Sequence, residues 1–506
     1  MKPQSSPQVD LFAPARHSLE ALIQSLTATV GTNTMHHVVE RTLSVQGTEV
    51  MRLLLQGYLE LCTANDRLMV EAKAEKEQFV VRSSARAIES TFGTVTLSRC
   101  SLPATEPMRA LFPLDLKLNL PTDRYSFEVR QRVAYFAVTV SLDTALAMMD
   151  RTTGAHVPKR QAQQLVVRSA ADFAEFYERP IGPANDAVPH DALLVLSADC
   201  TGLSMIPSAL REATRKRAEA ACREAPTHGN PMAPSKKKRR AHSKRMACVT
   251  TVYDQAPTVR TAEQIVGALA PAKSTTSASP TMAKPKNKVV RASVANTQYA
   301  ELSRMFDEAD RRDPEQRRTT VVWIDGDLTQ SRTIQRLARL RERSITVIND
   351  VIHVISYLWK AWTALCPKNE KKSWVDEQVT TSLVALLCGQ LSEVARKFEQ
   401  EIKANKPDAA KAKIVRKTVK YLRNHRSSMR YDEYLAAGYP IATGVVEGAC
   451  RHLVKDRMDL TGAQWGLQSA EAILALRAIT INGDWDAYWA FHCDQELLRT
   501  TAKLAA

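Results

Sequence analysis

Apolar residues recur at helical spacing through the first part of the chain. Two sets of four share one helix face each: Leu19, Leu22, Ile23 and Leu26, and then Val50, Leu53, Leu54 and Tyr58. Residues 1–88 are therefore predicted to form a helical N-terminal region. In residues 89–125 we expect a β-hairpin and a linker, because β-branched residues alternate in STFGTVTLSRCSLP and further prolines follow.

Residues 126–176 contain two helical patterns separated by a break at 152–157, and Pro158 suits the first position of the second helix. The apolar positions of the two helices are Leu142, Ala145, Leu146 and Met149, and then Ala162, Leu165 and Val166. The second helix opens with polar side chains that can reach phosphates and base edges: Lys159, Arg160, Gln161 and Gln164. We predict a helix-turn-helix DNA-binding module, with an ordinary pair of packed helices as the alternative.

From residue 190 onwards, short apolar strands alternate with helical stretches, which is typical of an α/β sheet. The candidate strands are residues 193–198, 246–253, 319–324 and 345–348. The spans 206–245 and 257–295 interrupt the pattern, and their content of Lys, Ala, Pro, Ser and Thr predicts that they lie outside the core. We expect a multidomain α/β chain with one domain at 190–490, a helical insertion at about 360–435 and a tail at 491–506.

The charge of the chain is concentrated in these spans. Residues 211–295 carry +13 of the formal net charge of +16, and a dense run within them consists of Lys236, Lys237, Lys238, Arg239 and Arg240. Such a run attracts a polyanion such as DNA, although a solvated tether has the same composition. No apolar stretch is long enough to span a membrane, and the scattered cysteines fit a reducing cytoplasm.

Three acidic residues stand in apolar surroundings. Asp199 and Asp325 each end an apolar strand, where a carboxylate can be held still and still face a ligand. Glu447 lies among apolar and small residues, with Arg451 and Lys455 four and eight positions later on the same face of a predicted helix. Carboxylates of this kind bind Mg²⁺, but a strand-end aspartate is also a common turn former and Glu447 with Arg451 could be a surface ion pair.

With their surroundings, these acids resemble the bacterial insertion-sequence transposases of the ISKra type. The matching stretches run in order from about residue 88 to 490: STFGTVTLSRC, FPLDLKLNLPTDRYSFEVRQRVAYFAVTVSLDTALAMMDRTTGAHVPKRQAQQLV, LSADCTGLSM, VVWIDGDLTQ, INDVIHVISYLW and MRYDEYLAAGYPIATGVVEGACRHLVKDRMDLTGAQW. The resemblance implies a DDE transposase with an RNase H-like fold. Its catalytic and metal-binding residues are then Asp199, Asp325 and Glu447, and its cofactor is Mg²⁺, or Mn²⁺ in its place.

Two details of the resemblance concern the second ligand and the first motif. Related transposases have an Asp-x-x-His motif after the second aspartate, and here it is Asp350 to His353. Asp350 is therefore an alternative to Asp325, although we expect it to cap a helix, with His353 and Asp327 as auxiliary candidates. Cys200 stands where the family usually has Gly, and because it is small we expect the geometry to be kept.

The resemblance implies a function in DNA transposition and recombination. The protein would bind the terminal inverted repeats of a mobile element and catalyse Mg²⁺-dependent strand cleavage and strand transfer, acting as a homo-oligomer on the bacterial nucleoid in the cytoplasm. We expect Arg451 and Lys455 to contact the double-stranded DNA together with the basic run. Two alternatives stay open: a non-catalytic DNA-binding protein derived from a transposase, and an RNase H-like nuclease without strand transfer.

Overall fold

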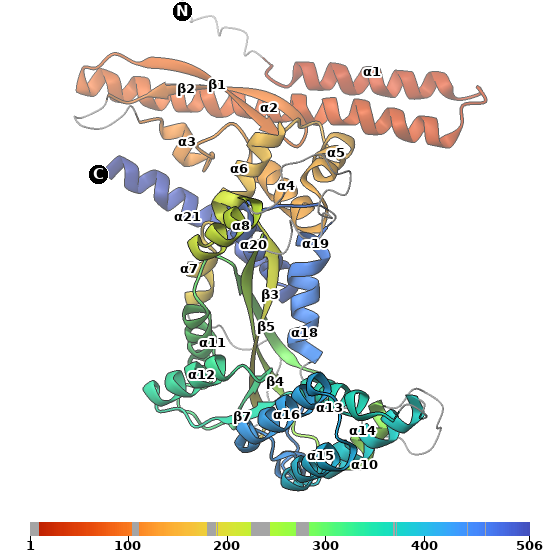
Figure 1. Ribbon diagram of the computed structural model, residues 1–506. Helices are drawn as coiled ribbons and strands as arrows, with labels where there is room; N and C mark the ends of the chain where they lie inside the picture. The colour runs from red at the N-terminus through yellow and green to blue at the C-terminus, as the bar shows by residue number, and fades with distance from the viewer. Residues whose placement is uncertain are drawn as a thin grey trace, which may run out of the picture. The chain divides into compact units, whose positions relative to one another are not determined.

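The computed structural model divides the chain into two compact units (Figure 1). The first unit is Met1–Glu178 with Gly483–Ala506, and the second is Arg179–Asn482. The segment predicted to be a separate tail thus belongs to the first unit. The structure describes residues 10–103, 111–179, 189, 191–223, 243–269, 283–367, 370, 372–442, 444–460 and 462–505. The basic run at 236–240 lies outside the described residues.

The first unit opens with two helices and a β-hairpin. They are α1 (Ala13–Thr29), α2 (His36–Glu77), β1 (Arg82–Ser90) and β2 (Gly93–Ser101). Side chains of α2 bond to the backbone of β2: Gln56 exchanges hydrogen bonds of 2.8 and 2.9 Å with the amide and carbonyl of Thr96, and the Thr63 hydroxyl donates to the Ser98 carbonyl. The prediction of helix up to residue 88 was wrong for the last residues, because the chain leaves α2 at Gln78 in a left-handed conformation.

The remaining helices of the first unit include those of the predicted DNA-binding module. They are α3 (Pro113–Lys117), α4 (Phe127–Thr139), α5 (Leu142–Thr152), α6 (Lys159–Ser169), α7 (Phe173–Glu178) and α21 (Trp485–Ala505). Ser126 and Ser141 cap α4 and α5 by accepting bonds from the amides three residues on. The predicted buried positions of α6 are confirmed, since Ala162, Leu165 and Val166 are at most 4% exposed.

The second unit is built on a mixed five-stranded sheet in the order β5-β4-β3-β6-β7. Its strands are β3 (Leu193–Ser204), β4 (Lys244–Gln255), β5 (Lys286–Ser293), β6 (Thr320–Ile324) and β7 (Thr346–Asn349). Strands β5, β4 and β3 are antiparallel neighbours, and β3, β6 and β7 are parallel. The α/β class predicted from the strand pattern is confirmed.

Helices cover both faces of this sheet, as the continuous apolar strands require. The helices are α11 (Gln298–Arg312) and α12 (Leu328–Leu340) on one face, and α13 (Val351–Leu365) with the helices after it on the other. Leu194 and Leu196 point to the first face, and Leu193 and Val195 point to the second.

The basic insertions are more structured than predicted. They contain a 3₁₀ turn at Pro207–Ala209, α8 (Glu212–Arg223), α10 (Ala262–Leu269) and the whole of β5. Val290 of β5 is fully buried and Ile265 of α10 packs in the core, so the placement of this span outside the core was wrong for residues 262–269 and 286–293, whereas residues 270–282 lie outside the described part. The lysines of β5 lie at one end of the strand, and its buried half alternates Val290 and Ala292 with the buried polar residues Arg291 and Ser293, so no apolar run marks this strand in the sequence.

The predicted helical insertion is present and leads back to the sheet. Its helices after α13 are α14 (Lys372–Leu387), α15 (Leu391–Asn405), α16 (Ala409–Asn424) and α17 (Tyr431–Ala436). The chain then forms α18 (Gly444–Ala449), a π-helical segment (Cys450–Lys455), α19 (Asp456–Met458) and α20 (Leu467–Asn482). Among the described helices, none has the length and apolar character needed to cross a membrane.

Candidate active site

The two aspartates predicted at strand ends lie on neighbouring parallel strands. Asp325 directly follows β6, as predicted, but β3 continues past Asp199 to Ser204, so Asp199 lies inside its strand. Ser197 of β3 pairs in register with Trp323 of β6, so Asp199 and Asp325, two residues further along each strand, are at the same level and on the same face. Parallel strands are about 4.8 Å apart, which places the two backbones side by side. The sheet register alone therefore brings two of the three predicted ligands together.

The third predicted ligand faces the same place from a helix. Glu447 is on α18, which packs on β3 and β4. A pocket at this edge of the sheet is lined by Ala198, Asp199, Trp323, Ile324, Asp325, Asp350, His353, Val446 and Glu447. The structure thus gathers four carboxylates and one imidazole around one cavity, and none of the described lining residues is Lys or Arg.

Asp350 takes the capping role that was expected of it. Its Oδ1 atom accepts a hydrogen bond of 3.0 Å from the amide of Ile352, at the start of α13, and its own amide donates to the carbonyl of Ile324. The side chain is nevertheless on the pocket wall, with His353 one turn further along the helix. Asp325 and Asp350 both face the cavity, so both stay candidates for the second ligand.

The charge of the pocket is visible in the pKa of Glu447. Glu447 as a residue is exposed, but partial burial of its carboxyl group raises its pKa above the usual range. The negative charges of Asp350 and Asp199 add to this effect, and His353 and Lys455 oppose it. Carboxylates that raise one another's pKa in this way favour a bound cation.

The donor set fits a hard divalent cation, since Mg²⁺ prefers carboxylate oxygens and commonly takes only one or two of them. In the described part of the chain, however, no three His, Cys, Asp or Glu side chains are arranged to coordinate one metal ion together. The pocket therefore supplies ligands of the right type in one place, without a closed coordination shell of protein atoms.

The turn that carries Asp325 is held by the helical insertion, a contribution that the sequence analysis missed. Gly326 has a φ of +93°, and a Cβ atom there would lie 2.5 Å from the hydroxyl of Tyr421 on α16. The buried ring of His425 donates to the Gly326 carbonyl across 3.0 Å. The Tyr421 hydroxyl also accepts a 2.7 Å hydrogen bond from the amide group of Asn349, at the end of β7. Only tertiary contacts reveal these roles.

Asp199 is held by sulfur and backbone donors. Its Oδ1 atom accepts from the Cys200 amide at 2.6 Å, and its Oδ2 atom accepts from the Cys450 thiol at 3.3 Å. Burial, together with Asp199, raises the pKa of the Cys450 thiol, so the thiol stays a neutral donor. Cys200 pairs in register with Cys248 on β4, and a small residue at this position leaves the strand regular, as expected.

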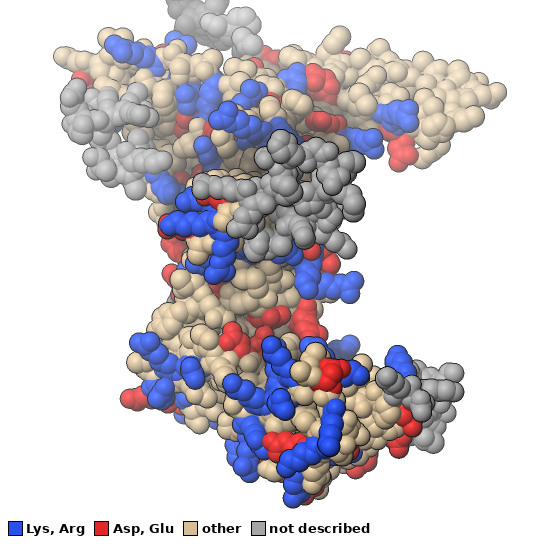
Figure 2. All heavy atoms as spheres, viewed as in Figure 1, with Lys and Arg blue, Asp and Glu red and all other residues tan. Residues whose placement is uncertain are grey.

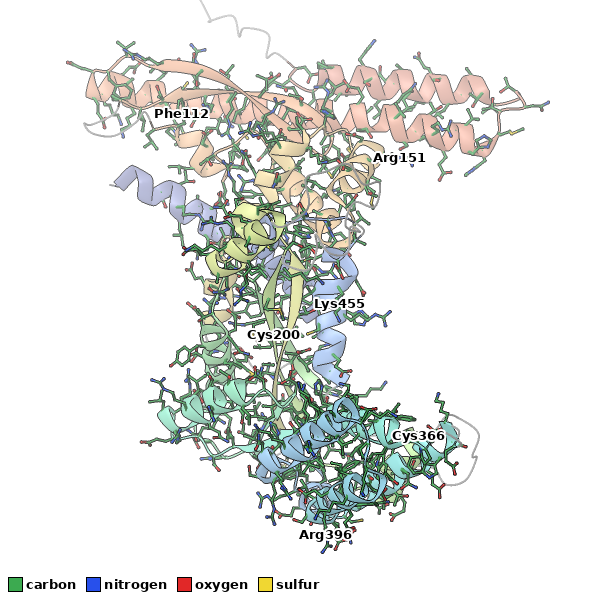
Figure 3. All side chains as sticks on the ribbon, in the orientation of Figure 1. Phe112, Arg151, Cys200, Cys366, Arg396 and Lys455 are labelled. Atoms are coloured by element: carbon green, nitrogen blue, oxygen red, sulfur yellow. The ribbon has the colours of Figure 1, made fainter. Side chains whose placement is uncertain are left out.

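Three predicted contributors lie away from the pocket lining. Asp327 is exposed and caps α12 by accepting from the Thr329 amide at 2.7 Å. The Arg451 side chain lies 3.7 Å from Asp456, which argues against the ion pair with Glu447. Lys455 is exposed on the segment that follows α18 (Figure 3). This segment is π-helical, so the even i, i+4 spacing assumed for Glu447, Arg451 and Lys455 does not hold.

The predicted DNA-binding helix presents its polar face to solvent. Arg160, Gln161 and Gln164 are exposed, and Lys159 is 2.7 Å from Asp143 at the start of α5. The connection from Thr152 to α6 is longer than the turn of a standard helix-turn-helix. The β-hairpin secures this connection, because the Gly154 amide donates to the Thr91 carbonyl and a Cβ atom on Gly154 would meet the Phe92 carbonyl at 2.5 Å.

A basic groove lies between α13 and α16 in the same unit as the acidic pocket. Its lining residues are Tyr357, Trp359, Lys360, Thr363, Ala364, Lys411, Ile414, Lys417 and Thr418. Helix α16 has six basic residues and no acidic one, and Figure 2 shows Lys and Arg gathered over the region where α13 and α16 lie. Tyr357 is one turn after His353 on α13, so the groove begins next to the pocket.

Neither the family models nor the curated protein sequences compared with this chain give a match.

Proposed function

We propose that this protein is a DDE transposase with an RNase H-like catalytic domain. The observation that carries the proposal is the shared pocket of Asp199, Asp325 and Glu447, in which two strands and a helix present acidic side chains to one cavity. Support also comes from the mixed sheet, whose three antiparallel strands are followed by two parallel ones. Phosphodiester exchange needs positioned negative ligands rather than a protein nucleophile, and this pocket offers that arrangement.

The roles of the residues follow from their positions. Asp199 is held within β3, Asp325 by the turn that follows β6, and Glu447 approaches from a separate helix. When bound, Mg²⁺ would stabilise negative charge on the phosphate oxygens during cleavage and joining. His353 faces the cavity and could donate a hydrogen bond to a phosphate oxygen there. Asp325 is the preferred second ligand, because the strand register sets it beside Asp199. Backbone hydrogen bonds do not separate the two candidates, since Oδ1 of Asp325 and Oδ1 of Asp350 each accept one of 3.0 Å.

DNA contact is assigned to two surfaces. The basic groove runs along α13 from Tyr357 to Ala364, about 10 Å at the helical rise, and so matches roughly three phosphate steps of one DNA strand. Its lysines can neutralise these phosphates, and its aromatic side chains offer flat faces to unpaired bases. The exposed face of α6 is the candidate reader of the terminal inverted repeats, with the polar residues at its start.

The experiment is a gel assay with labelled duplexes that carry the DNA flanking the gene, in Mg²⁺, Ca²⁺ or chelator. Asp199→Asn, Asp325→Asn and Glu447→Gln each keep the side-chain shape but remove the charge. We expect cleavage and joining to fall together by several orders of magnitude in each variant, while binding persists. Asp327→Asn is the matched control, because that acid caps a helix outside the pocket lining.

The outcomes separate the proposal from its alternatives. Cleavage that continues in chelator, or in all three variants, would refute the catalytic site. Binding without cleavage in the unaltered protein under every metal condition would favour the non-catalytic DNA-binding protein. Cleavage without any joined product would favour the nuclease.

A further inference from the structure

Helix α2 carries a stripe of largely apolar side chains that the described part of the chain leaves about half exposed. Its residues, called the α2 stripe below, are Met51, Leu54, Tyr58, Leu61, Asn65 and Leu68. Its five large apolar members are 40–66% exposed, although they lie in the middle of a 42-residue helix. The buried positions Leu59, Val70 and Ala74 lie on the opposite side of the helix, whereas Val50 and Gly57 are buried at the border of the stripe, where the N-terminal end of α1 meets α2. The α2 stripe therefore does not contribute to the core of its own unit.

The spacing within the α2 stripe alternates between three and four residues, which is the heptad repeat of a coiled coil. Every d position is leucine: Leu54, Leu61 and Leu68. The a positions are Met51, Tyr58 and Asn65. An ordinary surface helix has no reason to keep a repeat of 3.5 residues on its exposed side, because that period matters only where a second helix packs along it.

We propose that the α2 stripe pairs with the α2 stripe of a second copy of this chain, forming a parallel, in-register two-stranded coiled coil. Leucine at d favours two strands, and a single asparagine at an a position fixes register and oligomeric state. Only the parallel, in-register arrangement brings Asn65 of one copy against Asn65 of the other. Any other arrangement places a buried amide against an apolar side chain, which is unfavourable.

The size of the surface is compatible with a moderate, concentration-dependent dimer. The six half-exposed side chains have a solvent-exposed area on the order of 500 Å² per copy. A dimer of two copies would therefore bury about 1,000 Å², near the lower limit for a specific interface. A largely apolar patch of about 500 Å² is the size of the largest such patch on a typical monomer, and these patches are often functional. Helix α1 does not block most of the stripe, because its N-terminal end meets α2 at Gly57 and the stripe continues for 11 residues beyond that point.

The test is the mass of the full-length protein without DNA, measured by sedimentation over a concentration series. We expect a monomer–dimer equilibrium that the double change Leu54→Glu and Leu61→Glu weakens at least 10-fold, with unchanged circular dichroism because both residues are exposed. Val45→Glu is the control, since Val45 is 68% exposed on the same helix but outside the α2 stripe. A protein that stays monomeric up to about 100 µM, or a dimer that the double change leaves intact, would overturn the proposal.

Two changes at Asn65 test the register. Asn65→Leu should tighten association and allow species larger than a dimer, because the polar a position no longer restricts the assembly. Asn65→Cys should form an intermolecular disulfide on mild oxidation, beyond the amount formed by the unaltered protein with its native cysteines. A dimer whose Asn65→Cys variant does not cross-link would refute the parallel, in-register arrangement. None of these measurements depends on DNA or on catalysis, so they stand apart from the proposed function.

Discussion

At the scale of single residues, Gly326 shows how one backbone position keeps a candidate metal ligand in place. It follows Asp325, adopts a φ of +93° and lies against the ring of Tyr421. Two separate constraints therefore act on it: a conformation that other residues adopt only with strain, and a contact that leaves no room for a methyl group.

We expect Gly326→Ala to cost about 1–3 kcal/mol of unfolding free energy from backbone strain, and more from the contact with Tyr421. It should also reduce DNA cleavage, because the carboxylate of Asp325 moves with the turn. Gly462→Ala is the control, since Gly462 has a similar φ of +80° but open space around the position of its Cβ. The difference between the two variants in unfolding free energy, measured with denaturant, gives the contribution of the contact with Tyr421. Equal losses of stability would show that this contact contributes nothing.

A second residue-scale feature is the buried carboxylate of Asp172. Burial alone would raise its pKa, but hydrogen bonds from Arg499 and His492 outweigh burial and lower the pKa to about 2. A depressed pKa means that the unfolded state binds the proton more tightly than the folded state. The resulting stability is present above the unfolded value near pH 4 and is lost as the pH falls towards 2.

We therefore expect Asp172→Asn to destabilise the docking of α21 by about 2 kcal/mol at pH 7, the free energy of a shift of this size. Hydrogen exchange of the α21 amides should be roughly 30-fold faster than in the unaltered protein. The difference in exchange rate between the two proteins should narrow as the pH falls from 4 to 2. Over this range the unaltered protein loses the same charge on Asp172. A constant difference across this range would show that the charge of Asp172 is not the cause.

At the scale of elements, α6 and the connection before it form the candidate reader of DNA sequence. The hairpin β1–β2 holds the connection at Gly154, so the start of α6 is fixed while its polar side chains face solvent. A recognition helix needs this combination, since base contacts require a rigid backbone and free side chains. Both the hairpin and these helices belong to the first unit.

We expect Gln161→Ala or Gln164→Ala to cost about 1–3 kcal/mol of binding to the flanking DNA and to relax its sequence preference. Arg160→Ala should instead weaken binding to all sequences alike, because a phosphate contact carries no base information. The measurement is a competition assay with scrambled duplexes. Unchanged preference in both glutamine variants would remove α6 as the reader and favour the ordinary pair of packed helices.

At the scale of the whole molecule, the basic groove and the acidic pocket share helix α13. Tyr357 on the groove side stacks on Tyr421 at 3.9 Å between ring centroids, and Tyr421 in turn touches Gly326. The helical insertion therefore contacts the turn of Asp325 and also places positively charged side chains beside the pocket. Lys411 and Lys417 are exposed in the groove and form none of the described ion pairs, so their charge is available to a polyanion.

We expect Lys411→Ala and Lys417→Ala each to weaken DNA binding and to reduce the slope of log K against log salt concentration by about 0.9, the value for one phosphate contact. Lys403→Ala is the control, because Lys403 is exposed on α15 but does not line the groove. Titrations at several salt concentrations provide the slopes. A slope that changes equally in all three variants would indicate a general charge effect rather than a binding groove.

Short-range patterns in the sequence account for most local features of this protein. Four of the five strands of the second unit, the helices α5 and α6 and the cap formed by Asp350 follow from hydrophobic period and from capping chemistry, which act between residues close in the chain. Asp199 and Asp325 were found for the same reason, since each follows a recognisable apolar strand. The strand β5 was missed because its local composition is basic and only pairing with β4 makes it a strand.

The tertiary structure decided how distant parts of the chain meet. The register of β3 and β6 sets Asp199 beside Asp325, and α18 brings in Glu447 from more than 100 residues away. The contacts of Tyr421 and His425 with the Gly326 turn, the union of α21 with the first unit and the exposure of the α2 stripe likewise have no local signal. Periodicity says which face of a helix is apolar, but only the packed chain shows which of these faces its own core leaves uncovered.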